Sequence, residues 1–133
     1  MKKLMLLRHG KSDWAADFGT DHERPLASRG EKAARLMGRF ITSAEMIPDR
    51  VISSSAARAL STARLAMEAG NWNLRLEVSD RLYDTSPGSV IAFLNELDAE
   101  CECLMLVGHN PVWENLLSLL VSGGRFRMPT AAL

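Results

Sequence analysis

The sequence predicts a three-layer α/β/α fold, in which helices cover both faces of a mostly parallel central sheet. Short apolar runs alternate with longer amphipathic segments along the whole chain, beginning with a strand and ending with a helix. The runs at residues 4–7 and 103–107 are continuously apolar, which is typical of strands buried on both faces. With 133 residues, 47% of them apolar, the chain is long enough to build one core.

The first elements are a strand, a long loop and a helix. The strand is expected over residues 3–7 and is followed by a polar, irregular stretch over residues 10–25. Long loops in compact domains often carry function. The first helix is expected from Ser28 to about Ala44, with Ser28 as its N-cap and Glu31 completing a capping box.

Three further strands and three helices follow the first helix. The strands are expected over residues 50–53, 74–78 and 103–107. The helices are expected to begin at residues 54–55, 86–87 and 111, and the first and last of them to end at residues 70–71 and 123–124. Residues 126–133 look like the entry to another strand. We therefore expect a single domain over residues 1–133, whose C-terminus is either truncated or simply short.

Charge and composition exclude several classes of protein. Lys plus Arg equal Asp plus Glu, at 16 each, which argues against a general nucleic-acid-binding or membrane-surface role. No apolar run is long enough for a signal peptide or a membrane span, so a cytoplasmic protein is expected. Cys101 and Cys103 have neither the spacing nor the number of a zinc site, and reduced structural thiols are expected.

Arginine and histidine residues follow three of the predicted strands. They lie in residues 8–10 (Arg-His-Gly), in residues 53–58 and in residues 108–110 (Gly-His-Asn). Turns of this kind lie on one edge of a parallel sheet, so we expect Arg8, His9, Arg58 and His109 to converge there. Guanidinium groups match phosphate oxygens and stay charged. The sequence therefore predicts a site for a phosphate dianion.

His9 is the expected nucleophile, because neutral imidazole is a competent nucleophile toward phosphorus. The nearby guanidinium charges lower a histidine pKa and favour the neutral form. His109 is expected to stabilise the transition state through a hydrogen bond. Phosphoryl transfer needs mainly positioning and charge stabilisation, so the arrangement requires no metal and no cofactor. Gly10 is expected to let the backbone approach the ligand, and Ser12 to contact the phosphate or a partner.

Each of these residues, taken alone, also has a purely structural interpretation. The evidence for a phosphate site is that they occur together at three equivalent turns. A single His at a strand end is usually structural, and a single Arg in a helix usually faces solvent. His22 is interpreted as a solvated loop residue. Trp14 either walls the pocket or packs the loop onto the core. Asn110 is expected to shape its turn or cap the last helix.

The chain resembles the histidine phosphatase (phosphoglycerate mutase-like) superfamily in motifs spread along its length. Residues 8–10 match the Arg-His-Gly signature, and residues 25–30 resemble the segment before the first helix. Residues 54–63 match Ser-Pro-x-x-Arg-Ala-x-x-Thr-Ala, with Ser55 in place of Pro, and residues 107–109 match Val-x-His. The resemblance implies the phosphoglycerate mutase-like fold. It also implies that His9 is the phosphorylated residue and that Arg8, Arg58 and His109 complete its phosphate pocket.

Within the superfamily, the chain is most similar to the small SixA-type phosphohistidine phosphatases. This similarity is carried by residues 8–14, 22–26, 82–84 and 108–111. The mutase branch usually has Glu and Asn where this chain has Lys11 and Ala15, and it has a long insertion over the site for which this chain is too short. The resemblance implies a metal-independent phosphatase. An uncapped pocket would admit phosphohistidine on a histidine-containing phosphotransfer protein.

The proton donor is the least clearly marked part of the site. The superfamily usually supplies an acid after the third strand, and Asp84 is the best match, followed by Asp80. Alternatively, Asp84 caps the helix that starts near Ser86. A phosphoramidate P–N bond is labile and depends less on an enzyme acid. Two other functions stay open: a phosphomonoesterase for small phosphate esters, and a non-catalytic phosphate-binding module.

Overall fold

A sheet of four parallel strands in the order β1-β4-β2-β3 forms the centre of the molecule. The computed structural model describes residues 1–98 and 100–133. Its strands are β1 (Lys3–Arg8), β2 (Arg50–Ser54), β3 (Leu76–Ser79) and β4 (Cys103–Gly108). Its helices are α1 (Ser28–Ser43), α2 (Ala57–Ala69), α3 (Pro87–Glu96) and α4 (Val112–Leu120), with short 3-10 helices η1 (Asp21–Glu23) and η2 (Asp80–Leu82).

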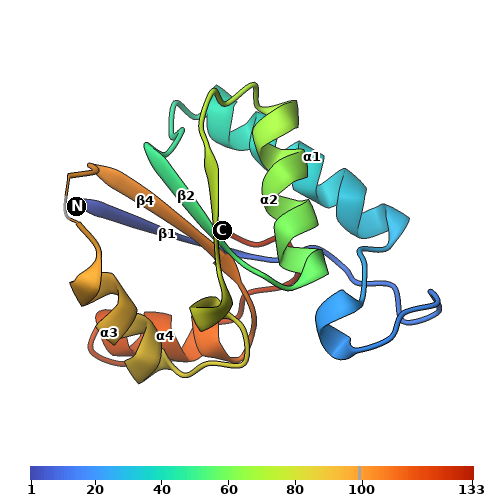
Figure 1. The fold of residues 1–133 in the computed structure, drawn as a ribbon. Coiled ribbons are helices and arrows are strands. Elements are labelled where there is room, and N and C mark those ends of the chain that lie inside the picture. Colours follow the sequence, from blue (N-terminus) through green and yellow to red (C-terminus); the bar gives the residue numbers. More distant parts are fainter. Residues whose placement is uncertain (99) are drawn as a thin grey trace.

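The helices cover the two faces of the sheet in pairs, α1 with α2 and α3 with α4 (Figure 1). Successive strand residues point to opposite faces, so the apolar strands supply two cores. Leu104 and Leu106 of β4 pack with Trp113 of α4, while Met105 and Val107 pack under α1 and α2. The expected three-layer α/β/α fold with a parallel sheet is therefore confirmed.

The register of the strands places the three predicted turns side by side. Arg8, at the end of β1, is the Cα partner of Gly108, and Ser53 of β2 is the partner of Val107. The central strand β4 lies between β1 and β2. The chain therefore leaves β1, β4 and β2 at the same edge of the sheet.

The start of α1 differs from the prediction. Its N-cap is Ala27, whose side chain makes no capping hydrogen bond, and Ser28 is already helical. The reason is a long-range contact: the backbone N–H of Ala27 donates to the carbonyl of Lys11 at 2.8 Å. A Cβ on Gly30 would lie 2.2 Å from that same carbonyl. Packing of α1 against the loop after β1 therefore overrides the capping box.

Three other boundaries were expected slightly differently. Ser54 ends β2, and α2 begins at Ala57 after the extended residue Ala56. The third strand begins two residues later than expected, at Leu76. At α3 the prediction is confirmed, since Ser86 is the N-cap, its hydroxyl accepts from the backbone N–H of Ser89, and a proline follows in the first turn.

The C-terminal residues lie along the outer edge of β1. No strand is assigned over residues 125–133, although the sequence resembles the entry to one. Two backbone hydrogen bonds join the segment to the end of β1, from Arg8 to the carbonyl of Ala132 at 2.9 Å and from Ala131 to that of His9 at 3.0 Å. The two segments run antiparallel, because the bonded residue moves forward from Arg8 to His9 in one segment and backward from Ala132 to Ala131 in the other.

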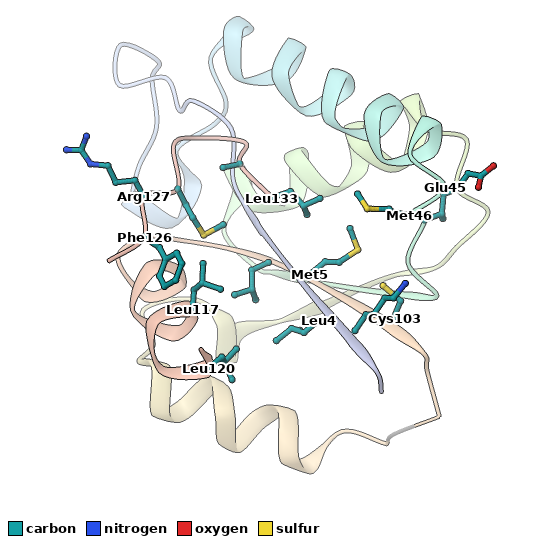
Figure 2. A pocket seen from close by; sticks show the side chains of 15 residues that line it. Leu4, Met5, Glu45, Met46, Cys103, Leu117, Leu120, Phe126, Arg127 and Leu133 are labelled. Atoms are coloured by element: carbon teal, nitrogen blue, oxygen red, sulfur yellow. The ribbon is translucent and has the colours of Figure 1, made fainter. Parts of the chain in front are cut away.

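A hollow of about 490 Å³ lies beside this exposed edge of β1. Figure 2 shows its apolar lining, with Leu4 and Met5 from β1, Met46 from the turn after α1, and Leu117 and Phe126 on the α4 side. None of the residues predicted to form the phosphate site lines this hollow. It is thus separate from the edge of the sheet where the three turns meet.

Cys101 and Cys103 are free thiols, as expected from the sequence. Burial raises the pKa of the Cys103 thiol and disfavours the thiolate form. Within the part of the chain that the structure describes, no helix has the length and apolar character needed to cross a membrane.

Candidate active site

His9 is buried directly after β1, with 8% of its surface exposed. Its Nδ1 lies 2.7 Å from the carbonyl oxygen of Gly10. A carbonyl only accepts hydrogen bonds, so Nδ1 carries the proton of the neutral ring and Nε2 keeps a free lone pair. Burial, opposed by the Gly10 hydrogen bond and aided by the charges of Arg58 and Arg8, lowers the pKa of His9 to about 4. His9 is therefore a neutral imidazole at pH 7.

His109 faces His9 from the turn after β4, with the ring centroids 5.2 Å apart. Its Nε2 lies 2.8 Å from the hydroxyl oxygen of Ser54, which itself accepts from the backbone N–H of Ala56. We assign the Ser54 hydroxyl as the donor to Nε2, which places the ring proton on Nδ1. Burial and the neighbouring His9 and Arg58 lower the pKa of His109 to about 3. His109 is therefore a neutral donor in the free protein.

Two predicted arginines are held by backbone carbonyls beside these rings. Arg8 donates from Nη1 to the carbonyl of Met128 at 2.8 Å, and Arg58 donates from Nη1 to that of Asp21 at 2.7 Å. Both Nε atoms, like Nδ1 of His109, are buried and have no partner among the described residues. Buried donors without partners cost free energy, and an oxyanion is the type of ligand that satisfies several of them together. The four predicted residues are thus brought together with unused donors.

Two further charged residues and a tyrosine belong to the same cluster. Asp21 bridges the guanidiniums of Arg24 and Arg58, and it also accepts a hydrogen bond from the hydroxyl of Tyr83 at 2.8 Å. Arg24 is buried, and its charge adds to those that lower the pKa of His9. Arg24 and Tyr83 lie in segments that resemble the SixA branch, and Asp21 directly precedes one of them, but their spacing in the sequence did not indicate a role for any of the three. Only the folding of residues 10–25 over the sheet edge places them here.

A cavity of about 260 Å³ opens beside Arg58 and His109. It is lined by residues 21, 58, 82–85 and 109–112. Asp84, the predicted acid, lines it, whereas Asp80 lies in η2 and does not. Asp84 is exposed and has a positive φ of 47°. The alternative in which Asp84 caps α3 is wrong, because Ser86 is the N-cap.

Gly10 and Ser12 contact the protein rather than open space. The N–H of Gly10 donates to the Thr62 hydroxyl at 3.0 Å, and a Cβ at position 10 would lie 2.7 Å from the carbonyl of Gly30. Close packing on Gly30 of α1 therefore requires glycine here, and the approach of this backbone to a ligand stays a prediction. Ser12 is buried, and its hydroxyl accepts from Nε of Arg24 at 3.0 Å.

For three other residues the structure excludes one of the sequence-based interpretations. His22 is half-buried rather than solvated, with Nε2 2.9 Å from the Ser55 hydroxyl and its ring edge-on to Tyr83. Trp14 does not pack onto the core, since it is 68% exposed. Asn110 does not cap α4, whose N-cap is Pro111. Its amide instead donates to Glu114 and to the carbonyl of Met128, joining the turn to α4 and the C-terminal residues.

The guanidinium of Arg24 lies under the exposed ring of Trp14, with Cζ 3.6 Å from the ring centroid. A cation over an aromatic face is attracted by the ring and held in place by it. Trp14 therefore covers Arg24 on the side of the loop that faces solvent.

Known proteins resemble this chain in sequence or in fold. An uncharacterized protein of Mycobacterium tuberculosis is 35% identical over 117 residues, which are 87% of this chain and 70% of that protein. A structure from Agrobacterium tumefaciens assigned as a phosphohistidine phosphatase SixA is 30% identical, with a TM-score of 0.81, over 89% of this chain and 75% of its own.

A second solved structure is that of the protein histidine phosphatase SixA in complex with tungstate. It is 25% identical, with a TM-score of 0.85, over 96% of this chain and 83% of its own. The profile of the Histidine phosphatase superfamily (branch 1) matches residues 4–100, which include the first two of the three turns. With this match and the fold of its neighbours, the chain belongs to the histidine phosphatase superfamily.

Proposed function

We propose that the chain is a phosphatase that forms a phosphohistidine on His9 and acts on phosphohistidine of another protein. The observation that carries the proposal is the state of His9: a buried neutral ring whose Nδ1 proton is held by Gly10 and whose Nε2 is free to attack. Family membership supports the phosphatase activity, and the similarity to the two SixA structures supports the choice of substrate.

The reaction has two displacement steps at phosphorus. First, Nε2 of His9 forms a bond to the phosphorus, the P–N bond of the substrate breaks, and the substrate imidazole leaves with a proton taken from solvent or Asp84. Next, water attacks the phosphorus and gives one proton to solvent or to Asp84, the bond to Nε2 breaks with its electron pair returning to His9, and inorganic phosphate leaves with the water oxygen. The unpaired Nε donors of Arg8 and Arg58 and Nδ1 of His109 are suited to bind the phosphoryl oxygens in both steps.

A phosphomonoesterase for small molecules is the second candidate, and it is supported by Asp84. This carboxylate lines the cavity next to Arg58 and His109, where a leaving group would lie. An alkoxide leaving group needs a proton more than imidazole does, so an acid at this place is suited to ester hydrolysis.

A substrate panel separates the two candidates. Wild type and His9→Ala are incubated with a phosphorylated histidine-containing phosphotransfer protein, with sugar phosphates and with nucleotides, and released phosphate is measured. We expect turnover of the phosphoprotein by wild type only. Turnover of the esters without the phosphoprotein would favour the second candidate. Wild-type activity in His9→Ala would refute the nucleophile assignment.

A non-catalytic module is tested by labelling. Wild type is mixed with the ³²P-labelled phosphoprotein and quenched in alkali after milliseconds to seconds. Acid-labile label on wild type and its absence from His9→Ala are expected. If no donor labels His9 and no substrate turns over, the chain binds phosphate without catalysis.

A further inference from the structure

Asp21 joins more of the charged groups around the site than any single catalytic candidate does. One carboxylate oxygen accepts from Nη1 of Arg24. The other accepts from Nη2 of Arg58 at 3.0 Å and from the hydroxyl of Tyr83 at 2.8 Å. The backbone carbonyl of Asp21 accepts from Nη1 of Arg58 at 2.7 Å. One residue in η1 therefore holds two arginines that come from different parts of the chain.

The two arginines are buried, whereas Asp21 is not. Arg24 and Arg58 are each 6% exposed, and the Asp21 side chain is about 50% exposed. Both arginine charges act on His9, since each contributes to lowering its pKa. A free arginine side chain has many rotamers, and fixing it at a binding site costs conformational entropy. The hydrogen bonds to Asp21 fix both arginine side chains before a ligand binds, so this entropy is already lost in the free protein.

The hydrogen bonds leave other guanidinium atoms available. Both terminal nitrogens of Arg58 are taken by Asp21, and its buried Nε has no partner among the described residues. Arg24 uses Nε for Ser12 and Nη1 for Asp21. Asp21 thus holds both terminal nitrogens of Arg58 and one of Arg24, and leaves Nε of Arg58 unpaired among the described residues.

Asp21 is ionised under all ordinary assay conditions. Burial by itself would raise the pKa of this carboxyl, but hydrogen bonds from Tyr83, Arg24 and Arg58 lower it to about 2. Its negative charge is therefore a fixed part of the site. A charge in this position either orients the arginines or competes with the phosphate for them.

We propose that Asp21 is a positioning residue, which orients the guanidiniums of Arg58 and Arg24 for a phosphoryl group without touching the substrate. Tyr83 assists by donating to the oxygen that also receives Arg58. The proposal rests on the proposed function in one respect only, that the site binds a tetrahedral oxyanion. Asp21 then acts through the two arginines, and its removal has a smaller effect when Arg58 is absent.

Oxyanion affinity tests this proposal without requiring turnover. The Kd of inorganic phosphate and of orthovanadate is measured by titration calorimetry for wild type, Asp21→Asn and Asp17→Asn. Asp17 is an exposed carboxylate in the same loop and serves as the matched control. We expect Asp21→Asn to weaken binding roughly tenfold, the scale of one charged hydrogen-bond partner, and Asp17→Asn to leave it unchanged.

A double-mutant cycle separates positioning from a general structural role. In the Arg58→Ala background, Asp21→Asn is expected to weaken binding by a smaller factor than in wild type, because only Arg24 then loses its partner. Tyr83→Phe, which keeps the ion pairs, should weaken binding by a smaller factor in the same direction. It also provides a test if Asp21→Asn fails to fold. Equal effects of Asp21→Asn in both backgrounds would refute the proposal.

The outcomes for Asp21 and for the proposed function are distinct. Tighter oxyanion binding by Asp21→Asn would mean that the carboxylate competes with phosphate, and unchanged binding would mean that it has no influence; either result overturns the positioning role. If no protein, including wild type, turns over a substrate but Asp21→Asn still binds oxyanions more weakly than wild type and Asp17→Asn, phosphatase activity is refuted. The positioning role of Asp21 is then still supported. Where turnover is measured, positioning predicts a rise in KM for Asp21→Asn that Asp17→Asn does not show.

Discussion

The rings of His9 and His109 lie 5.2 Å apart between centroids and are tilted by 55° to one another. His9 comes from the end of β1 and His109 from the end of the neighbouring strand β4. Each ring is held by a different partner, His9 by the carbonyl of Gly10 and His109 by the hydroxyl of Ser54. The pair therefore consists of two neutral imidazoles, one buried and one half-buried, with different free nitrogens: a lone pair on His9 and a donor on His109.

The pH dependence of catalysis follows from this pair. The pKa of His9 is lowered to about 4, so the attacking ring stays neutral down to that pH. Between pH 8 and 6, titration of His9 is expected to change kcat/KM for an acid-stable aryl phosphate very little. Below about pH 4, where His9 becomes protonated, we expect kcat/KM to fall. Steady-state kinetics from pH 3 to 8 measure this acid limb. A midpoint near 6.5 would mean that His9 titrates like an exposed histidine.

Stability has its own pH dependence, with the sign set by the same lowered pKa. Between pH 6.5 and about 4 the unfolded chain binds a proton at His9 that the folded chain does not. Folding therefore loses stability as pH falls through this window, with a slope approaching 1.4 kcal/mol per pH unit and a total on the order of 3 kcal/mol. Urea unfolding of wild type and His9→Gln should show a shallower slope for the variant. Parallel curves for the two proteins would contradict the prediction.

Packing of α1 on α2 depends on Gly38. A Cβ at this position would lie 2.0 Å from the carbonyl oxygen of Ala66, which is backbone and cannot turn aside. We expect Gly38→Ala to lower the free energy of unfolding by about 1–3 kcal/mol, the usual cost of overpacking. Gly88→Ala in the first turn of α3 is the control, because nothing lies within 4 Å of its Cβ.

In the control variant Gly88→Ala, alanine reduces the conformational freedom of the unfolded chain and has a higher helix propensity than glycine. We therefore expect its free energy of unfolding to be unchanged or raised by up to about 1 kcal/mol. Chemical denaturation at constant m-value measures both variants. An unchanged midpoint for Gly38→Ala would show that the two helices move apart at little cost.

The role of Asp84 is tested by leaving-group dependence. Asp84 lines the cavity beside His109, so its removal should affect substrates in proportion to their need for a proton. We expect Asp84→Asn to slow an alkyl phosphate by roughly 10²-fold or more and a phosphoramidate by less than about tenfold. Single-turnover rates for the two substrates give the comparison. Asp80→Asn is the control, and equal losses for both substrates would exclude proton donation by Asp84.

The apolar pattern of the sequence was enough to predict the strands and the order of the elements. The positions of Arg8, His9, Arg58 and His109 directly after predicted strands were enough to predict that they converge. These predictions depend on alternation of apolar segments and on the rule that parallel strands end at one edge. The start of α1 was predicted wrongly, and the packing of Gly10 on α1 was not predicted, because both are decided by contacts with residues far along the chain. Gly10 packs on Gly30, and Ala27 donates to Lys11.

The sequence by itself determined that this chain builds a parallel α/β sheet and that two histidines and two arginines follow its strands. Tertiary structure alone decided how those groups are held. The loop over residues 10–25 has no regular periodicity, so nothing in its sequence fixes where it lies. Once folded over the sheet edge, it brings Asp21 between Arg24 and Arg58. Orientation of a charged side chain depends on partners distant in sequence, and only the folded chain supplies them.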